Sequence, residues 1–189
     1  MQLYFSLQCL SEPAHIREAK QYLLVREKTG NNDGKYIEQW QAFVGIPVGS
    51  PYCAAFVSYI LNKAKVIYPK IKSAVATRFI TEESINADDV YDGRVEIDDN
   101  YLAIWRNGKT WKGHIGFVYS WHKQEGYVIE ANTSSGYTGS QRDGQGVFIR
   151  FRKLSPSKYF RIVSFTKIRY QDEWGQLRKR LSGAFFWLF

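Results

Sequence analysis

Cys53, His114 and Glu130 are the residues of this 189-residue chain whose types could together perform nucleophilic chemistry. A cysteine sulfur becomes an effective nucleophile when a neighbouring base takes its proton, and a third group must hold that base in place. Histidine suits the role of base because its charge changes near neutral pH. The three residues are far apart in the sequence, so the fold has to bring them together.

Cys53 lies near the start of a predicted helix within the stretch GSPYCAAFVSYIL, residues 49–61. Ser50 is a suitable N-cap because its hydroxyl can accept a free backbone N–H, and Pro51 suits the first helical position. We therefore expect Cys53 about three residues into the helix, where the helix dipole makes a thiol ionise more easily. The alternative is a small cysteine that packs in the core.

His114 begins a predicted strand, and the following strand carries Glu130 and Asn132. These last two residues are two positions apart, so they lie on one face of their strand. A buried carboxylate is costly unless it is paired, and an imidazolium on the adjacent strand would pair it. A short hairpin joins the two strands, so we expect His114 and Glu130 to meet. Each residue alone also fits a structural histidine or an exposed glutamate.

The charge of the chain is unevenly distributed. The formal net charge is +8, and eight of the 18 acidic residues lie within residues 82–99, where Arg94 is the only base. The more basic remainder would attract an anionic partner such as nucleic acid, anionic lipid or a bacterial cell wall. The sequence has no helix-turn-helix, zinc-finger or RNA-binding aromatic signature, so we expect no nucleic-acid partner.

The residues that commonly bind metals show no ligand pattern. Cys9 and Cys53 lie in different contexts, which indicates neither a disulfide framework nor a zinc site. The turn cluster at residues 30–34 lacks the oxygen-ligand spacing of a calcium loop, so Asp33 is expected to cap the next helix. We expect no metal and no cofactor. His15 is expected on the surface of the first helix.

Helical periodicity comes first along the chain and strand periodicity follows. Helices are predicted at residues 14–28, 35–44 and around Cys53, with a short one at 77–84. Strands are predicted at residues 101–105, 114–121, 127–133, 147–153 and 159–169. This order predicts an α+β fold in which N-terminal helices pack on an antiparallel sheet of about five strands.

The two ends of the chain differ from the predicted domain, residues 1–170. Residues 171–189 form a basic and aromatic tail that is a candidate for membrane contact. The favoured alternative is that this tail packs back on the domain as a final helix. The N-terminus lacks the positive start and apolar core of a secretory signal, and no run approaches the ~20 apolar residues of a membrane span. We therefore expect synthesis in the cytoplasm.

Four stretches, taken in this order, resemble the CHAP family of cysteine, histidine-dependent amidohydrolases and peptidases. They are GNNDG at 30–34, GSPYCAAFV at 49–57, GHIGFV at 113–118 and IEANTS at 129–134. The resemblance covers about residues 16–151, which is most of the chain. Members are papain-like cell-wall hydrolases of phage lysins and bacterial autolysins. The resemblance implies a papain-like fold with Cys53 as nucleophile, His114 as base, and Glu130 and then Asn132 completing the site.

The chain also departs from the family pattern. Tyr52 occupies the position before the cysteine at which tryptophan is common in the family. Residues 98–101 occupy the place where members usually carry a Gly-Asp pair, just before the strand that precedes the histidine. The acidic stretch at residues 82–99 is favoured as a solvated loop, with contact to a cation or a cationic ligand as the alternatives. It is longer than in the family pattern, so a substrate-side insert is a further candidate. No wall-binding repeat is present, so the basic surface or the tail would have to localise the protein at an anionic cell envelope.

The resemblance implies that a monomer hydrolyses an amide bond of peptidoglycan, as an N-acetylmuramoyl-L-alanine amidase or an endopeptidase. The backbone N–H of Cys53 and one further donor would bind the oxyanion, and the candidates for that donor are Asn31, Asn32 and Tyr36. The protein would act in the periplasm or cell wall after export or lysis. Alternatives are a cysteine amidase or peptidase effector that acts on a protein or isopeptide, an inert binding module, and a membrane-active protein.

Overall fold

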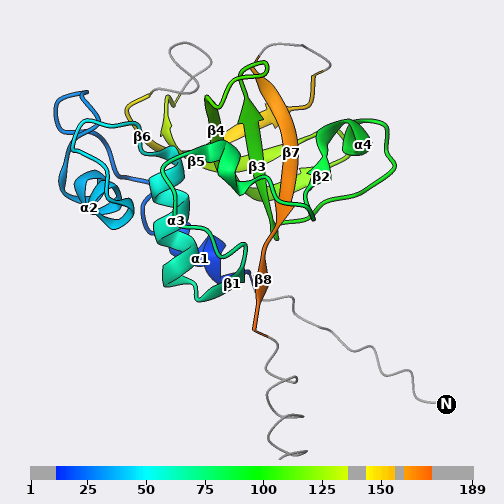
Figure 1. The fold of residues 1–189 in the computed structure, drawn as a ribbon, viewed down its shortest axis with the longest axis horizontal. Coiled ribbons are helices and arrows are strands. Elements are labelled where there is room, and N and C mark those ends of the chain that lie inside the picture. The colour runs from blue at the N-terminus through cyan, green and yellow to red at the C-terminus, as the bar shows by residue number, and fades with distance from the viewer. Residues whose placement is uncertain (1–11, 136–143, 156–159, 172–189) are drawn as a thin grey trace, which may run out of the picture.

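The computed structural model describes residues 12–135, 144–155 and 160–171 (Figure 1). Most of the predicted tail, residues 171–189, and Cys9 therefore lie outside the described residues. The helical elements are α1 (Ala14–Lys20), α2 (Lys35–Val44), α3 (Cys53–Lys63), the 3-10 helix η1 (Ala76–Phe79) and α4 (Ala87–Tyr91). Among the described residues, no helix has the length and apolar character needed to cross a membrane.

One antiparallel sheet follows the first three helices. Its strands are β2 (Ile85–Asn86), β3 (Tyr101–Arg106), β4 (Gly113–His122), β5 (Glu125–Thr133), β6 (Gly146–Lys153) and β7 (Arg161–Lys167). Their order across the sheet is β2-β7-β3-β4-β5-β6, and β6 forms one edge. A separate ribbon pairs β1 (Val66–Tyr68) with β8 (Arg169–Tyr170). The predicted α+β class is confirmed, and the sheet has six strands because the two-residue strand β2 pairs with β7.

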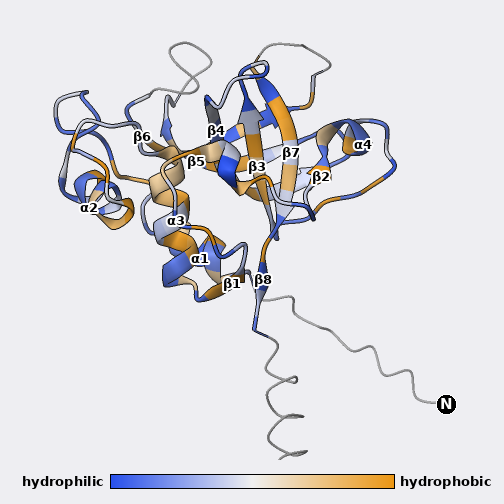
Figure 2. Cartoon of the chain, in the orientation of Figure 1, coloured by the Kyte–Doolittle hydropathy of each residue, from blue (hydrophilic) through white to orange (hydrophobic). Residues whose placement is uncertain are grey.

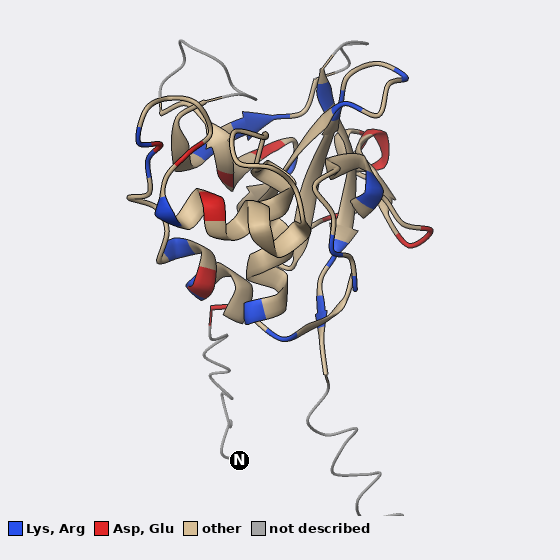
Figure 3. Ribbon diagram, turned by 60° about the vertical axis from the view of Figure 1, so that its left-hand side comes forward, with Lys and Arg blue, Asp and Glu red and all other residues tan. Residues whose placement is uncertain are grey.

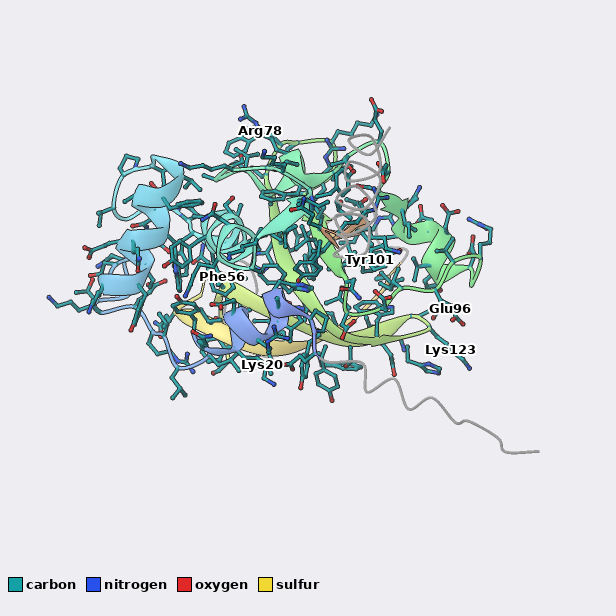
Figure 4. All side chains as sticks on the ribbon, turned by 90° about the horizontal axis from the view of Figure 1, so that it is seen from below. Lys20, Phe56, Arg78, Glu96, Tyr101 and Lys123 are labelled. Atoms are coloured by element: carbon teal, nitrogen blue, oxygen red, sulfur yellow. The ribbon has the colours of Figure 1, made fainter. Side chains whose placement is uncertain are left out.

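The sheet is packed on both faces. On one face α3 lies against β4 and β5, and α1 and α2 pack on α3 (Figure 1). Phe56 of α3 is fully buried between the helices and the sheet, where it contacts Trp40 and Phe117 edge-on (Figure 4). On the other face a second cluster joins α4 to Phe165 and neighbouring strand residues. Apolar residues are accordingly concentrated on α3 and the central strands (Figure 2).

The first helix ends eight residues earlier than predicted, at Lys20 instead of Lys28. The reason is tertiary: the chain after α1 pairs with the beginning of β6. The amide of Glu27 donates to the carbonyl of Gln145, and the amide of Val147 donates to the carbonyl of Val25. These hydrogen bonds occupy backbone groups that a longer helix would have used, so tertiary pairing overrides the helical periodicity.

Two predicted caps are wrong, although α2 begins and ends as predicted. Helix α3 begins at Cys53, two residues after Pro51, and it has no side-chain N-cap. The Ser50 carbonyl instead accepts a hydrogen bond from the Gln41 side chain. The Asp33 carboxylate accepts from the backbone N–H and hydroxyl of Thr29, so it closes the turn and does not cap α2. Cys53 is therefore the first residue of its helix.

The surface position predicted for His15 is also wrong, because this side chain is fully buried against Phe117. Its Nε2 donates to the carbonyl of Asp99 at 2.9 Å, and its Nδ1 contacts the Tyr170 hydroxyl, which β8 brings over α1. Burial lowers the pKa of His15 to about 4, although the Asp99 carbonyl opposes this change. The ring is thus neutral in the folded protein at neutral pH.

We expect His15 to make the protein acid-sensitive. The unfolded imidazole has a pKa near 6.5, so protonation favours the unfolded chain. The contribution of neutral His15 to stability is complete above about pH 6.5 and is lost as the pH falls toward about 4, by roughly 3 kcal/mol in total. In urea unfolding at pH 7.0 and 4.5, His15→Gln should lose clearly less stability on acidification than wild type.

His122→Gln is the matched control, because His122 is an exposed histidine on β4. This variant should retain the wild-type loss of stability between the two pH values. Equal losses in wild type and His15→Gln would contradict the assignment.

Candidate active site

Cys53 stands at the N-terminus of α3 and lines a groove of about 230 Å³. Its side chain is 7% exposed, and as the first helical residue it has a backbone N–H without an acceptor inside the helix. The groove is lined by residues from three separate segments of the chain: Pro51, Cys53, Ala74, Val75, Ala76, Trp111, Lys112 and Gly113. Trp111, at the β3–β4 hairpin, is 67% exposed. Cys53 is therefore a largely buried residue that lines a mostly apolar groove.

His114, the second residue of β4, is fully buried. Its Nε2 lies 2.8 Å from Oε2 of Glu130, so the carboxylate occupies one ring nitrogen. The other ring nitrogen, Nδ1, is buried without an aligned hydrogen bond and is left for the interaction with Cys53. Burial lowers the pKa of His114, but hydrogen bonding to Cys53 and Glu130 outweighs burial and raises the pKa to about 9. The ring is therefore protonated at neutral pH.

Glu130 is a fully buried carboxylate on β5, the strand next to the β6 edge of the sheet. Besides the His114 contact, Nε of Arg152 donates to Oε1 and Nη2 donates to Oε2, each at 2.6 Å. Burial raises the pKa of Glu130, but Arg152 and His114 together outweigh burial and lower it below the ordinary value. The carboxylate is thus ionised and shared by two cations.

Gly116 provides the space that this contact needs. It lies opposite Glu130 in the β4–β5 register, two residues after His114. A Cβ atom on Gly116 would lie 2.7 Å from Cγ of Glu130 and 2.6 Å from Cγ1 of Val128, closer than real side-chain contacts allow. Because Gly116 has no side chain, the Glu130 side chain can cross over it and reach His114.

Asn132 lies outside the His114 contact. Its backbone has a φ of +59°, and the β5–β6 register shifts between Ala131 and Thr133, so the strict alternation that places it beside Glu130 is interrupted. The side chain is fully buried, and neither Oδ1 nor Nδ2 has a hydrogen-bond partner among the described residues. The structure thus brings Cys53, His114 and Glu130 together, whereas the Asn132 side-chain amide has no hydrogen-bond partner in the described part of the chain.

The three predicted oxyanion donors do not line the Cys53 groove. Nδ2 of Asn31 donates to Thr29, and Nδ2 of Asn32 donates to the Gly49 carbonyl. Both residues line a separate hollow with Glu27. Tyr36 is 44% exposed on α2 and packs edge-on against Tyr22. Asn31 and Asn32 therefore shape the loop beside α3 and do not donate at the Cys53 groove.

Tyr52 fixes the loop that precedes the nucleophile. It is fully buried, and its hydroxyl donates to Oε1 of Glu27 at 3.1 Å. Oε2 of the same carboxylate accepts the backbone N–H of Asn32. Burial raises the pKa of Tyr52, and the neighbouring Glu27 raises it further, so the phenol stays protonated and acts as a donor. The position before Cys53 is therefore tied to the turn at residues 30–34.

Larger hollows lie elsewhere on the protein. One of about 660 Å³ is lined by the acidic segment around Glu96 and the β4–β5 turn around Lys123, which lie at the same end of the fold (Figure 4). That turn is at the opposite end of β4 from His114, about 26 Å along the strand. Within the described part of the chain, no three His, Cys, Asp or Glu side chains gather as metal ligands. The buried cysteine–histidine–glutamate arrangement, and not hollow size, thus identifies the candidate site.

Arg152 is the residue of this cluster that sequence reasoning missed. On β6 the apolar Ile149 and Phe151 are 38% and 41% exposed, while Arg150 is 6% exposed and Arg152 reaches the buried carboxylate. An apolar pattern alone predicts the reverse orientation. Two arginines at alternate positions of one strand were the available signal. The register, which pairs Arg152 with Gly126 and Arg150 with Val128 on the strand that carries Glu130, is not visible in the sequence.

Comparison with known proteins finds no family model and no curated protein that matches the chain. A function must therefore be inferred from the residues and from the chemistry of the site.

We expect Cys53 to react rapidly with iodoacetamide at pH 7, because a protonated His114 stabilises the thiolate that reacts. In a Cys9→Ser background, His114→Ala should slow alkylation by about tenfold, the effect of ~1.4 kcal/mol of lost stabilisation. Pseudo-first-order rates followed by mass spectrometry measure this. His122→Gln should react at the wild-type rate, and an unchanged rate in His114→Ala would contradict the pairing.

Proposed function

We propose that the protein hydrolyses an amide bond of peptidoglycan through a thioester on Cys53. The observation that carries the proposal is the buried His114, held by Glu130 on one ring nitrogen and interacting with Cys53 on the other side. A cysteine at a helix N-terminus with an oriented imidazole is an arrangement for nucleophilic attack on a carbonyl. The choice of peptidoglycan rests on the sequence resemblance to CHAP hydrolases.

In the proposed reaction, the Cys53 thiolate attacks the amide carbonyl and forms a tetrahedral oxyanion. The Cys53 backbone N–H, free at the start of α3, donates to that oxyanion. The protonated His114 then gives its proton to the leaving amine, the C–N bond breaks, and a thioester remains. Neutral His114 next takes a proton from water as the water attacks the thioester. This step releases the carboxylic acid and regenerates the sulfur nucleophile.

The groove supports a peptide segment of small residues as substrate. Ala74, Val75 and Ala76 line the groove together with Gly113, the residue before His114. Trp111 and Lys112 also line the groove, and the Trp111 carbonyl accepts a hydrogen bond from the Thr77 hydroxyl, which ties the hairpin to η1. Lys112 has no ion-pair partner among the described residues, so it can meet an anionic group of a ligand. A stem peptide with free carboxylates fits this chemistry.

We further propose that the protein acts as a monomer in the periplasm or cell wall and reaches the envelope through its basic residues or its tail. Lys and Arg occur on helices, strands and loops of the described chain (Figure 3). This distribution suits a general attraction to an anionic polymer and not a single binding patch.

We expect Cys53→Ala and His114→Ala each to lower the release of soluble muropeptides from purified sacculi by at least about 10³-fold. The double variant should be no worse, because the two residues act as a unit. Mass spectrometry of the products identifies the bond that is cut.

Cys9→Ser and His122→Gln are the matched controls and should retain wild-type rates. Wild-type digestion of walls by Cys53→Ala would contradict the mechanism. Cleavage of a protein or isopeptide substrate by the wild type, with the wall left intact, would instead favour a cysteine effector that acts on proteins.

A further inference from the structure

Four side chains from four adjacent strands form a connected row beneath the candidate nucleophile. Trp105 of β3 lies opposite His114 of β4, and their rings meet edge-on at 5.3 Å between centroids. Glu130 of β5 then joins His114 to Arg152 of β6. The guanidinium of Arg152 lies 5.6 Å from the Trp105 ring centroid. Trp105 therefore lies next to both cations of the row.

Arg152 holds Glu130 at two points. Its Nε binds Oε1 and its Nη2 binds Oε2, a fork-on-fork geometry that fixes the plane of the carboxylate. Oε2 is the same atom that binds Nε2 of His114 at 2.8 Å. Because the carboxylate plane is fixed, the imidazole is also fixed, with Nδ1 left for the thiol. Lysine has a single nitrogen and cannot reproduce both contacts.

We propose that Arg152 is a positioning residue that orients His114 through Glu130 and keeps an excess of one positive charge next to Cys53. The inference rests on the proposed roles of Cys53 and His114. With the ring protonated, His114, Glu130 and Arg152 together carry a net charge of +1, which favours an anionic sulfur. Asn132, the other predicted orienter, makes no hydrogen bond to the ring.

The charge around His114 comes from a small number of groups. Cys53 faces the ring from α3 and Glu130 from β5, with Arg152 behind Glu130 on β6, while Trp105 on β3 is uncharged. Removal of the Arg152 charge would let Glu130 hold the imidazolium proton more tightly. The titration midpoint of His114 must then move to higher pH. Loss of the two-point contact between Arg152 and Glu130 also leaves the His114 imidazole less firmly oriented.

The test is to replace Arg152 by methionine and by lysine and to follow the ¹⁵N chemical shifts of the His114 ring against pH. In wild type the ring should titrate near pH 9. Arg152→Met should raise this midpoint by about one pH unit or more. Arg152→Lys keeps the charge, so its midpoint should stay near that of wild type.

Measurements of kcat distinguish the role of the Arg152 charge from the role of its two-point contact with Glu130. Both variants should lower kcat on sacculi by about 10- to 100-fold with little change in KM, as is typical when a group that orients a catalytic ligand is lost. Arg161→Met is the matched control, because Arg161 also binds one carboxylate, Asp88, through two nitrogens but lies on β7. It should leave the His114 midpoint and kcat unchanged.

Wild-type kcat in Arg152→Lys, or an unchanged His114 midpoint in Arg152→Met, would overturn the proposal. If Arg152→Met does not fold, Glu130→Gln/Arg152→Met removes both buried charges and should fold, with a His114 midpoint below that of wild type. If the His114 midpoint shifts as expected in the Arg152 variants but the wild-type protein does not digest cell walls, only the peptidoglycan proposal is contradicted. If the wild-type protein digests cell walls and the Arg152 variants digest them at the same rate, only the Arg152 proposal is contradicted.

Discussion

The cost of burying one carboxylate organises this protein around its candidate site. Glu130 is inaccessible to solvent, and an isolated ionised carboxylate in that position would be strongly unfavourable. The fold meets this cost with cations from the strands on either side, His114 and Arg152, and with a glycine that clears the path between strands. Removal of one partner would leave an uncompensated charge, so the site is stable only as a complete set.

The second requirement is the position of α3. Its apolar residues fill the space between sheet and helices, so the start of the helix is set by the core and not by a cap. Tyr52 ties the preceding residue to Glu27, and Gln41 holds the Ser50 carbonyl. The same packing that stabilises the domain therefore delivers the Cys53 side chain to the beginning of β4.

Local pattern predicted much of this arrangement. The boundaries of α2 and the central strands follow from periodicity, and the His114–Glu130 pair follows from a short hairpin and strand alternation. What failed depends on distant pairing. The early end of α1 depends on contacts with β6, and the burial of His15 depends on β8. Arg152 escaped notice because no local rule says which face of an edge strand turns inward.

On β6 the apolar side chains point outward and the arginines point inward, which bears on how this strand could meet another chain in a crowded solution. The chain after α1 pairs with the beginning of β6, and Ile149 and Phe151 lie beyond that pairing with exposed side chains. An unpaired stretch of sheet edge can hydrogen-bond to another chain, and exposed apolar side chains favour such association. Charges that point inward along an edge are a recognised deterrent, because a newly added strand must accommodate them. Arg150 and Arg152 occupy those positions. The side chain that braces the buried acid is therefore also one of the inward-pointing charges of this edge strand.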